Sequence, residues 1–270
     1  MRPVRLYRWR KSSSQHGNFG DEITIPILDR IFGIEAVPVG LKQAELLGAG
    51  SILDYFVRKF GRPPFWRRVF PSHRLHVWGT GTLLDEDPIL WPQKLSFHAV
   101  RGPLTAKRAG LSGVTLGDPG ILASRLIKNP GLEVAVAVVP HHLDAGRLPD
   151  LPPHWRMVHP VQPVDLVLQK LASAELVISS SLHGLIVADS FGIPTVWTAL
   201  LGGRPKGQPN STHKFLDYAL ARGRPFNAPI SWVDAMSMSE DKLLGIATRC
   251  GRGVEAWQDE LIAAFPSELK

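Results

Sequence analysis

The chain has 270 residues, of which 44% are hydrophobic and 20% are charged, with a formal net charge of +7 and a pI near 9.8. This composition excludes a disordered chain, and no apolar run is long enough to predict a membrane span. The basic excess indicates an anionic partner: a phosphorylated metabolite, a membrane surface, an acidic glycan or a nucleic acid. Cys250 is the single cysteine, so no intrachain disulfide can form, which fits a reducing cytoplasm.

Short apolar runs alternate with helical patterns along the first half of the chain. A turn at Asn18–Gly20 begins a segment that is predicted to end as a helix at Gly33, and a second helix is predicted over 103–110, with proline at its start and glycine at its end. Strands are predicted, in chain order, at 3–9, 44–50, 75–81, 96–102 and 114–120.

A second series of the same kind fills the rest of the chain. Its predicted strands are at 132–142, 155–160, 175–181 and 195–200, and its predicted helices are at 164–174, 182–192 and 213–223. This alternation predicts an α/β fold with parallel sheets in two Rossmann-like domains. We expect an N-terminal domain over 1–128, a C-terminal domain over 129–250, and a helix in 251–270 that packs back on the first domain.

The stretch SSSLHGLIVADSFGIP, residues 179–194, follows the apolar strand AELVIS. Apolar residues at helical spacing predict an amphipathic helix after the serines, with Ser180 or Ser181 as its N-cap. His183 then lies where the carboxyl end of a strand meets the start of a helix. Ligands bind at that edge of open α/β sheets, and a helix N-terminus favours an anion.

Residues 55–76 form a basic and aromatic segment without an acidic side chain. The segment is interpreted either as a lid or membrane-surface element, or as a solvated loop whose aromatic residues pack on the nearest domain. No recognition motif supports nucleic-acid binding. The glycine-containing stretches 48–51 and 79–82 do not continue into a dinucleotide-binding fingerprint, so they are either anion-binding loops or tight turns.

An ordered series of motifs resembles the polysaccharide pyruvyl transferase family, and most of all the bacterial exopolysaccharide ketal pyruvyl transferases. The motifs are NFGDEI (18–23), GAGSIL (48–53), RGPLT (101–105), GDPG (117–120), VVPHH (138–142), SSSLHGLIVADSFGIP (179–194) and HKFLDY (213–218). The resemblance implies a fold like the GT-B glycosyltransferases, with two domains facing a cleft. It also implies phosphoenolpyruvate as the donor, a sugar diol as the acceptor, and no cofactor. Some relatives carry arginine where this chain has Ser181.

The chemistry of this transfer selects candidate residues. A proton donor is needed for the methylene carbon of phosphoenolpyruvate, and His183 is the first choice because imidazole exchanges protons near neutral pH. Arg101 is predicted to clamp an anionic group of the donor, with a salt bridge across its loop as the alternative. Lys214 opens a predicted helix, where a cation is favoured only near an anion, so it is assigned to the donor phosphate or else to solvent. Ser180 and Ser181 are assigned to donor binding.

Two further pairs of residues are candidates. His141 and His142 follow a predicted strand and are assigned to the donor or to a second acid–base role. Together with Asp144 they could form a metal site, but adjacent histidines point apart on an extended chain, so no bound metal is expected there. Asn18 is assigned to the acceptor, and Asp21 either deprotonates an acceptor hydroxyl or caps the helix, with capping favoured. Asp118 is expected to be structural.

Two other functions fit the same patterns. One is a GT-B glycosyltransferase that uses a nucleotide sugar, and the other is a non-catalytic protein that binds acidic glycans or membranes through 55–76. For the transferase, the expected partners are phosphoenolpyruvate and a sugar acceptor, in particular a lipid-linked oligosaccharide, without nucleic acid. The expected location is the cytoplasm, with 55–76 as a candidate contact to the inner face of the membrane.

Overall fold

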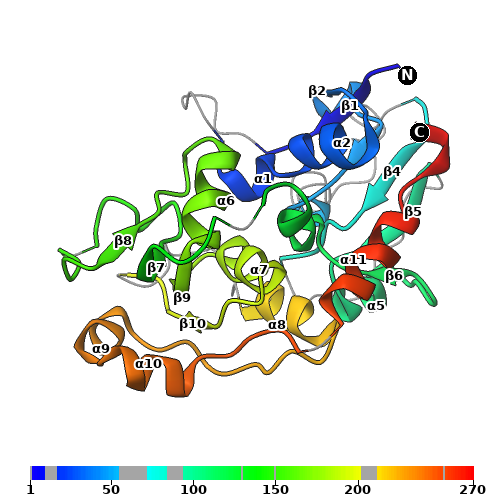
Figure 1. Ribbon diagram of the computed structural model, residues 1–270. Coiled ribbons are helices and arrows are strands. Elements are labelled where there is room, and N and C mark those ends of the chain that lie inside the picture. The colour runs from blue at the N-terminus through cyan, green and yellow to red at the C-terminus, as the bar shows by residue number, and fades with distance from the viewer. Residues whose placement is uncertain are drawn as a thin grey trace.

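The computed structural model describes residues 2–9, 17–54, 72–83, 94–128, 130–148, 150–201, 212–251 and 253–270. Within these ranges the chain forms one six-stranded and one four-stranded sheet, and all pairings between named strands are parallel (Figure 1). The predicted α/β class with parallel sheets is confirmed. Residues 55–71 lie outside the described part, so the lid and membrane interpretations of that segment stay predictions.

The larger sheet is built by the first half of the chain. In spatial order its strands are β2 (Ala36–Pro38), β1 (Val4–Tyr7), β3 (Leu46–Leu47), β4 (Leu75–Trp78), β5 (Leu95–Val100) and β6 (Thr115–Leu116). Strand β2 had not been predicted, because it has only three residues, lies at the sheet edge and ends on a proline, which an edge strand tolerates. Of the other five strands, four fall within the predicted segments, and β5 begins one residue before its predicted segment.

The smaller sheet is built by the second half. In spatial order its strands are β10 (Thr195–Trp197), β9 (Ala174–Ser179), β7 (Val134–Val139) and β8 (Trp155–Met157). Strands β7 and β9 pair in a register that sets Val139 opposite Ser179. The two segments that follow, 140–142 and 180–183, therefore leave the sheet side by side at its carboxyl edge.

Helices connect the strands in both halves. They are α1 (Phe19–Glu22), α2 (Thr24–Phe32), η1 (Leu41–Gln43), α5 (Pro103–Arg108), η2 (Pro119–Arg125), α6 (Val164–Ala172), α7 (Leu182–Ser190), α8 (Thr212–Leu220), α9 (Trp232–Ser237), α10 (Glu240–Ile246), α11 (Val254–Ala263) and η3 (Ser267–Leu269), where η marks a 3₁₀ helix. The predicted stop at Gly33 is confirmed: the residue takes φ +66° and its N–H bonds the Asp29 carbonyl.

Helix α7 corrects the amphipathic prediction. All nine of its residues are buried, including Asp189. The helix lies in the middle of the molecule, where it contacts η2, β9, α6, β10 and α1 (Figure 1). A helix surrounded by protein needs no polar face. The apolar spacing was therefore correct, but it did not mean that one side faces solvent.

The main buried core draws on both sheets. It contains Phe19 and Ile121 from the first half together with Val177 and Ile186 from the second. Helix α11 packs on the first half, where Trp257 Nε1 donates to the Leu116 carbonyl over 2.6 Å. The domain limits at 128 and 250 stay predictions. No helix in the described ranges is long and apolar enough to cross a bilayer.

Candidate functional site

The turn from β9 into α7 is organised by Ser179. Its hydroxyl lies 2.7 Å from the Val139 carbonyl on the neighbouring strand and accepts the Ser181 N–H over 2.9 Å. Ser181 occupies the N-cap position, but its side chain makes no capping bond. The prediction that a serine precedes the helix is confirmed, whereas side-chain capping by Ser181 is not observed.

His183 lies in the first turn of α7 and is packed between elements of both halves. Its ring meets Phe19 edge-on at 6.3 Å between centroids, and its Nε2 faces Asp118 Oδ2 at 3.6 Å. On the other side of the ring, a Cβ built on Gly20 would overlap Nδ1. Only glycine therefore allows α1 to approach this histidine so closely.

Asp118 had been assigned a structural role, and the structure gives it a second contact. One carboxylate oxygen accepts the Gly120 N–H over 2.9 Å and caps η2. The other oxygen and His183 Nε2 are both buried, and neither has a hydrogen-bond partner among the described residues. The imidazole and the carboxylate thus lie close together at 3.6 Å, beyond hydrogen-bond distance, and the motif GDPG alone did not reveal this proximity.

Asp21 lies in α1, one residue after the glycine that contacts His183. The capping alternative is wrong, because Asn18 caps α1 by accepting the Gly20 N–H over 3.1 Å. Asp21 keeps part of its surface exposed, yet burial of the carboxylate raises its pKa to about 6, while the charges of His183 and Lys214 act in the opposite direction. A carboxyl group with this pKa can exchange protons near neutral pH.

Lys214 belongs to the first turn of α8, as predicted. Its Nζ lies 5.3 Å from the centroid of the Phe215 ring, and its charge lowers the pKa of Asp21. Arg8, at the end of β1, also lowers that pKa and forms an ion pair with Glu22. No separate signal in the sequence marks Arg8, since it is one of several basic residues in the N-terminal stretch.

Arg101 is buried in an ion pair that joins the two halves of the chain. Its side chain has no exposed surface, and Nε lies 3.2 Å from Asp217 Oδ2 in α8. The guanidinium also donates to the Ser51 hydroxyl and to the Thr82 carbonyl. This burial favours the salt-bridge interpretation over an anion clamp, although the partner lies on a distant helix and not across the same loop.

His141 and His142 follow β7 and do not point apart. Their ring centroids are only 4.1 Å from each other, because the residues lie beyond the strand in a turn. The His141 N–H donates to Ser180 Oγ over 2.8 Å, and Ser180 in turn lies 3.1 Å from Asp144 Oδ2. His142 lies 6.3 Å from Trp9, centroid to centroid, so the ends of β7 and β1 approach each other.

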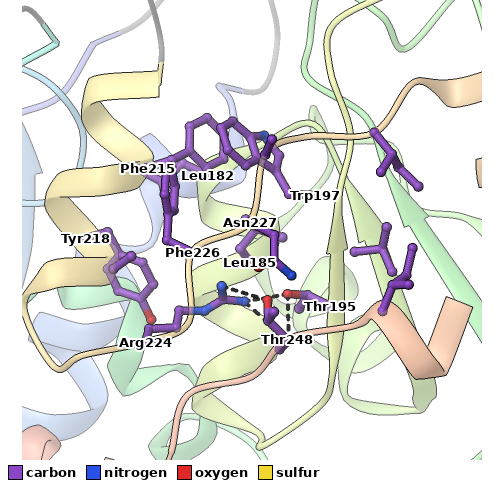
Figure 2. Close-up of a pocket in the computed structure, with 15 residues that line it drawn as sticks. Leu182, Leu185, Thr195, Trp197, Phe215, Tyr218, Arg224, Phe226, Asn227 and Thr248 are labelled. Carbon is purple, nitrogen blue, oxygen red and sulfur yellow. Dashed lines mark hydrogen bonds between the residues drawn. The ribbon is translucent and has the colours of Figure 1, made fainter.

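An apolar pocket of about 140 Å³ is lined by residues of α7, α8 and β10 (Figure 2). Trp197 stacks on Phe215 at 4.4 Å between centroids, and Phe226 lies next to Trp197. At the other end Arg224 bonds the hydroxyls of Thr195 and Thr248. The pocket shares its helices with the acid–base group but contains none of its titratable side chains.

The structure thus brings together the predicted residues His183, Asp21 and Lys214, and it adds Asp118 to them. The carboxyl-end residues Ser180, Ser181, His141 and His142 border this group, and Asn18 fixes the start of α1. The arrangement combines a carboxylate–imidazole pair, a carboxyl group with a raised pKa and a lysine. These groups can exchange protons with a bound ligand and can attract an anion.

Known proteins resemble this chain along most of its length. A family model described as polysaccharide pyruvyl transferase matches residues 18–200, a range that contains every candidate residue except Lys214. The succinoglycan biosynthesis protein ExoV of Rhizobium meliloti (strain 1021) is 30% identical over 245 residues, which cover 84% of this chain and 69% of that protein.

Two further comparisons concern proteins without an assigned function. An uncharacterized protein of Acanthamoeba polyphaga mimivirus is 35% identical over 156 residues, which are 53% of this chain and 53% of that protein. The crystal structure of a functionally uncharacterized protein from Klebsiella pneumoniae aligns with a TM-score of 0.42 and 13% identity, covering 80% of this chain and 87% of the other.

Proposed function

Because this chain belongs to the polysaccharide pyruvyl transferase family, we propose that it transfers pyruvate from phosphoenolpyruvate to two hydroxyls of a sugar as a cyclic ketal. The proposed acceptor is an exopolysaccharide or its lipid-linked repeat unit, since one relative is named for succinoglycan biosynthesis. We also propose that the two sheets belong to a GT-B-like pair of Rossmann-like domains, and that the enzyme works in the cytoplasm.

The reaction requires one proton to be added to the donor and two protons to be removed from the acceptor. One proton is added to the methylene carbon of phosphoenolpyruvate, which forms an oxocarbenium-like centre beside the carboxylate. The first hydroxyl adds to this centre, the bond between carbon and the phosphate oxygen breaks, and the second hydroxyl closes the ketal. The two hydroxyls release two protons: one balances the proton delivered to carbon, and the other leaves with the phosphate.

His183 is the residue proposed to protonate the methylene carbon. Its Nε2 faces Asp118, which would hold one proton on that nitrogen and stabilise the charged ring, as carboxylates do for catalytic histidines. Its Nδ1 is packed against Gly20 at the start of α1, and this contact holds the ring in place. Asp21 lies in the same helix and is proposed to take the proton of an acceptor hydroxyl, for which a pKa of about 6 is suitable.

The anionic groups of the donor need positive charge and N–H donors. We propose that Lys214 binds the phosphate and that the N-terminus of α7 at Ser181 faces the carboxylate or the phosphate. His141 and His142 would add donors from the neighbouring strand end, held in place by Ser180. Arg101 is proposed to act indirectly, by fixing the helix that carries Lys214.

The observation that carries this proposal is the contact between Gly20, His183 and Asp118 beside Asp21, within a chain of this family. A sugar-nucleotide transferase and a non-catalytic binding protein remain the alternatives. Neither alternative requires an imidazole beside a buried carboxylate at this position.

The proposal is tested by acceptor-dependent release of phosphate from phosphoenolpyruvate. We expect His183→Ala to lower turnover by about a hundredfold or more while the protein stays folded, as a cooperative thermal melt would show. His154→Ala is the matched control, because His154 is exposed and lies in the turn before β8. Near-normal turnover of His183→Ala would remove this residue from the chemistry.

A further inference from the structure

His76 in β4 and His98 in β5 face each other at a place that the proposed chemistry does not use. His76 Nδ1 and His98 Nε2 are 2.8 Å apart, and the two rings are stacked with 5.0 Å between centroids. The carboxylate of Glu268, in η3, completes the group. One ligand atom from each residue lies within 4.8 Å of the others.

The fold brings these three residues together for identifiable reasons. Side chains alternate along a strand, so His76 lies on the same face of the sheet as Trp78, whose Nε1 donates to the Leu261 carbonyl in α11. His76 pairs with Ser96 in β5, and an irregularity in register between Val77 and Trp78 leaves His98 as the extra residue between Phe97 and Ala99. The turn after α11 then delivers Glu268 to the same face.

The ligand types suit a divalent transition metal, and the 2.8 Å between the two imidazole nitrogens would widen slightly when an ion replaces their hydrogen bond. Zn²⁺ binds imidazole nitrogen and carboxylate oxygen at about 2.0–2.2 Å, so ligand atoms of one ion lie about 3–4 Å apart. Both imidazoles lie partly or wholly inside the protein, and burial, the largest cause, lowers the pKa of each. Of the nearby charged groups, Glu45 and Glu268 are negative and Arg74 is positive.

We propose that His76, His98 and Glu268 bind one divalent metal ion, with Zn²⁺ as the best match to two imidazoles and a carboxylate. The ion would fasten the C-terminal segment to the middle of the six-stranded sheet, since its ligands come from β4, β5 and η3. His76 is buried, His98 is half-buried and Glu268 is exposed, so the site opens to solvent on one side. A fourth position would be filled by water.

The site differs in kind from the acid–base group around His183. It contains none of the residues proposed for pyruvate transfer, and it joins elements of the first half to the end of the chain. The expected absence of a metal at His141 and His142 concerned residues that are adjacent in sequence. The present group is distributed over two strands and the C-terminal segment, and no spacing in the sequence indicates it.

The test is Zn²⁺ binding by tag-free full-length protein after treatment with a chelator. We expect one ion per chain by calorimetry, and a melting temperature about 5–10 °C higher at a hundredfold excess over the dissociation constant. His98→Ala and Glu268→Gln should each weaken binding by at least tenfold and abolish most of the shift. His154→Ala should keep both, although His154 also pairs with a glutamate, Glu240, at 2.8 Å.

Two results would overturn this proposal. One is wild-type protein that binds no Zn²⁺ at micromolar free metal, which would leave an ordinary hydrogen bond between the imidazoles. The other is equal affinity in wild type, His98→Ala and Glu268→Gln. Co²⁺ gives a second readout, because its visible absorption should indicate a tetrahedral site in wild type and be lost in both variants.

Discussion

Gly20 is the residue at which α1 comes closest to the His183 ring. A methyl group there would overlap Nδ1, so we expect Gly20→Ala to displace the imidazole or the helix and to lower turnover by about a hundredfold. The matched control is Gly245→Ala in α10, where a Cβ would meet no atom within 4 Å. Steady-state kinetics and thermal melts of both variants check this. Full activity of Gly20→Ala would show that the close contact is unimportant.

Asp21 should make the protein less stable at high pH. Its folded pKa of about 6 lies above the usual value of an aspartate, so the folded state binds this proton more tightly than the unfolded state. The stabilisation from the bound proton is complete below about pH 4 and is lost as the pH rises through 6.

Replacing Asp21 with asparagine removes the loss of stability that accompanies the rise in pH. We expect Asp21→Asn to unfold at higher urea concentration than wild type at pH 8, by on the order of 1–2 kcal/mol after allowance for its partly exposed surface, and to differ little at pH 4. Turnover should be lost at both pH values. Asp29→Asn, at an exposed position in α2, is the control. An equal effect at pH 4 and pH 8 would contradict the raised pKa.

At the scale of elements, the Arg101–Asp217 pair connects the loop after β5 to helix α8. Removing one partner of a buried pair leaves an uncompensated charge, which costs about 3–5 kcal/mol. We therefore expect Arg101→Ala and Asp217→Ala each to lower the free energy of unfolding by about that amount. The double variant should lose clearly less than the sum of the two losses.

Chemical denaturation of the three variants and wild type measures this coupling, and the donor KM provides the discriminating readout. If Arg101 were an anion clamp, Arg101→Ala would raise the KM for phosphoenolpyruvate and leave stability nearly unchanged. Asp217→Ala would then not raise this KM. Additive losses in the double variant would argue against a direct interaction between the two side chains.

Much of the element order could be predicted because local patterns determine it. The run VAVAVV predicts β7, and the glycine at residue 33 predicts the end of α2. Strand β2 could not be predicted, because three residues at a sheet edge carry no periodic signal. Helix α7 was misjudged in one respect: apolar spacing does not tell whether the remaining side chains meet solvent or protein.

At the scale of the whole molecule, the site depends on contacts between segments that are distant in sequence. His183 and Lys214 could be selected from the sequence because local patterns predict the end of a strand and the start of a helix. The contacts of His183 with Gly20 and Asp118 could not be predicted, since they arise only when the two sheets pack on one shared core. The pairing of Arg101 with Asp217 has the same origin.

The central claim is the transfer of pyruvate from phosphoenolpyruvate to a sugar diol, and mass spectrometry of the acceptor tests it most directly. A lipid-linked oligosaccharide of the exopolysaccharide type is incubated with the protein and phosphoenolpyruvate, and in parallel with nucleotide sugars. We expect the acceptor to gain the mass of one pyruvate less one water with phosphoenolpyruvate only, and not with His183→Ala. A gain of one sugar residue from a nucleotide sugar, with no change from phosphoenolpyruvate, would contradict the proposed function.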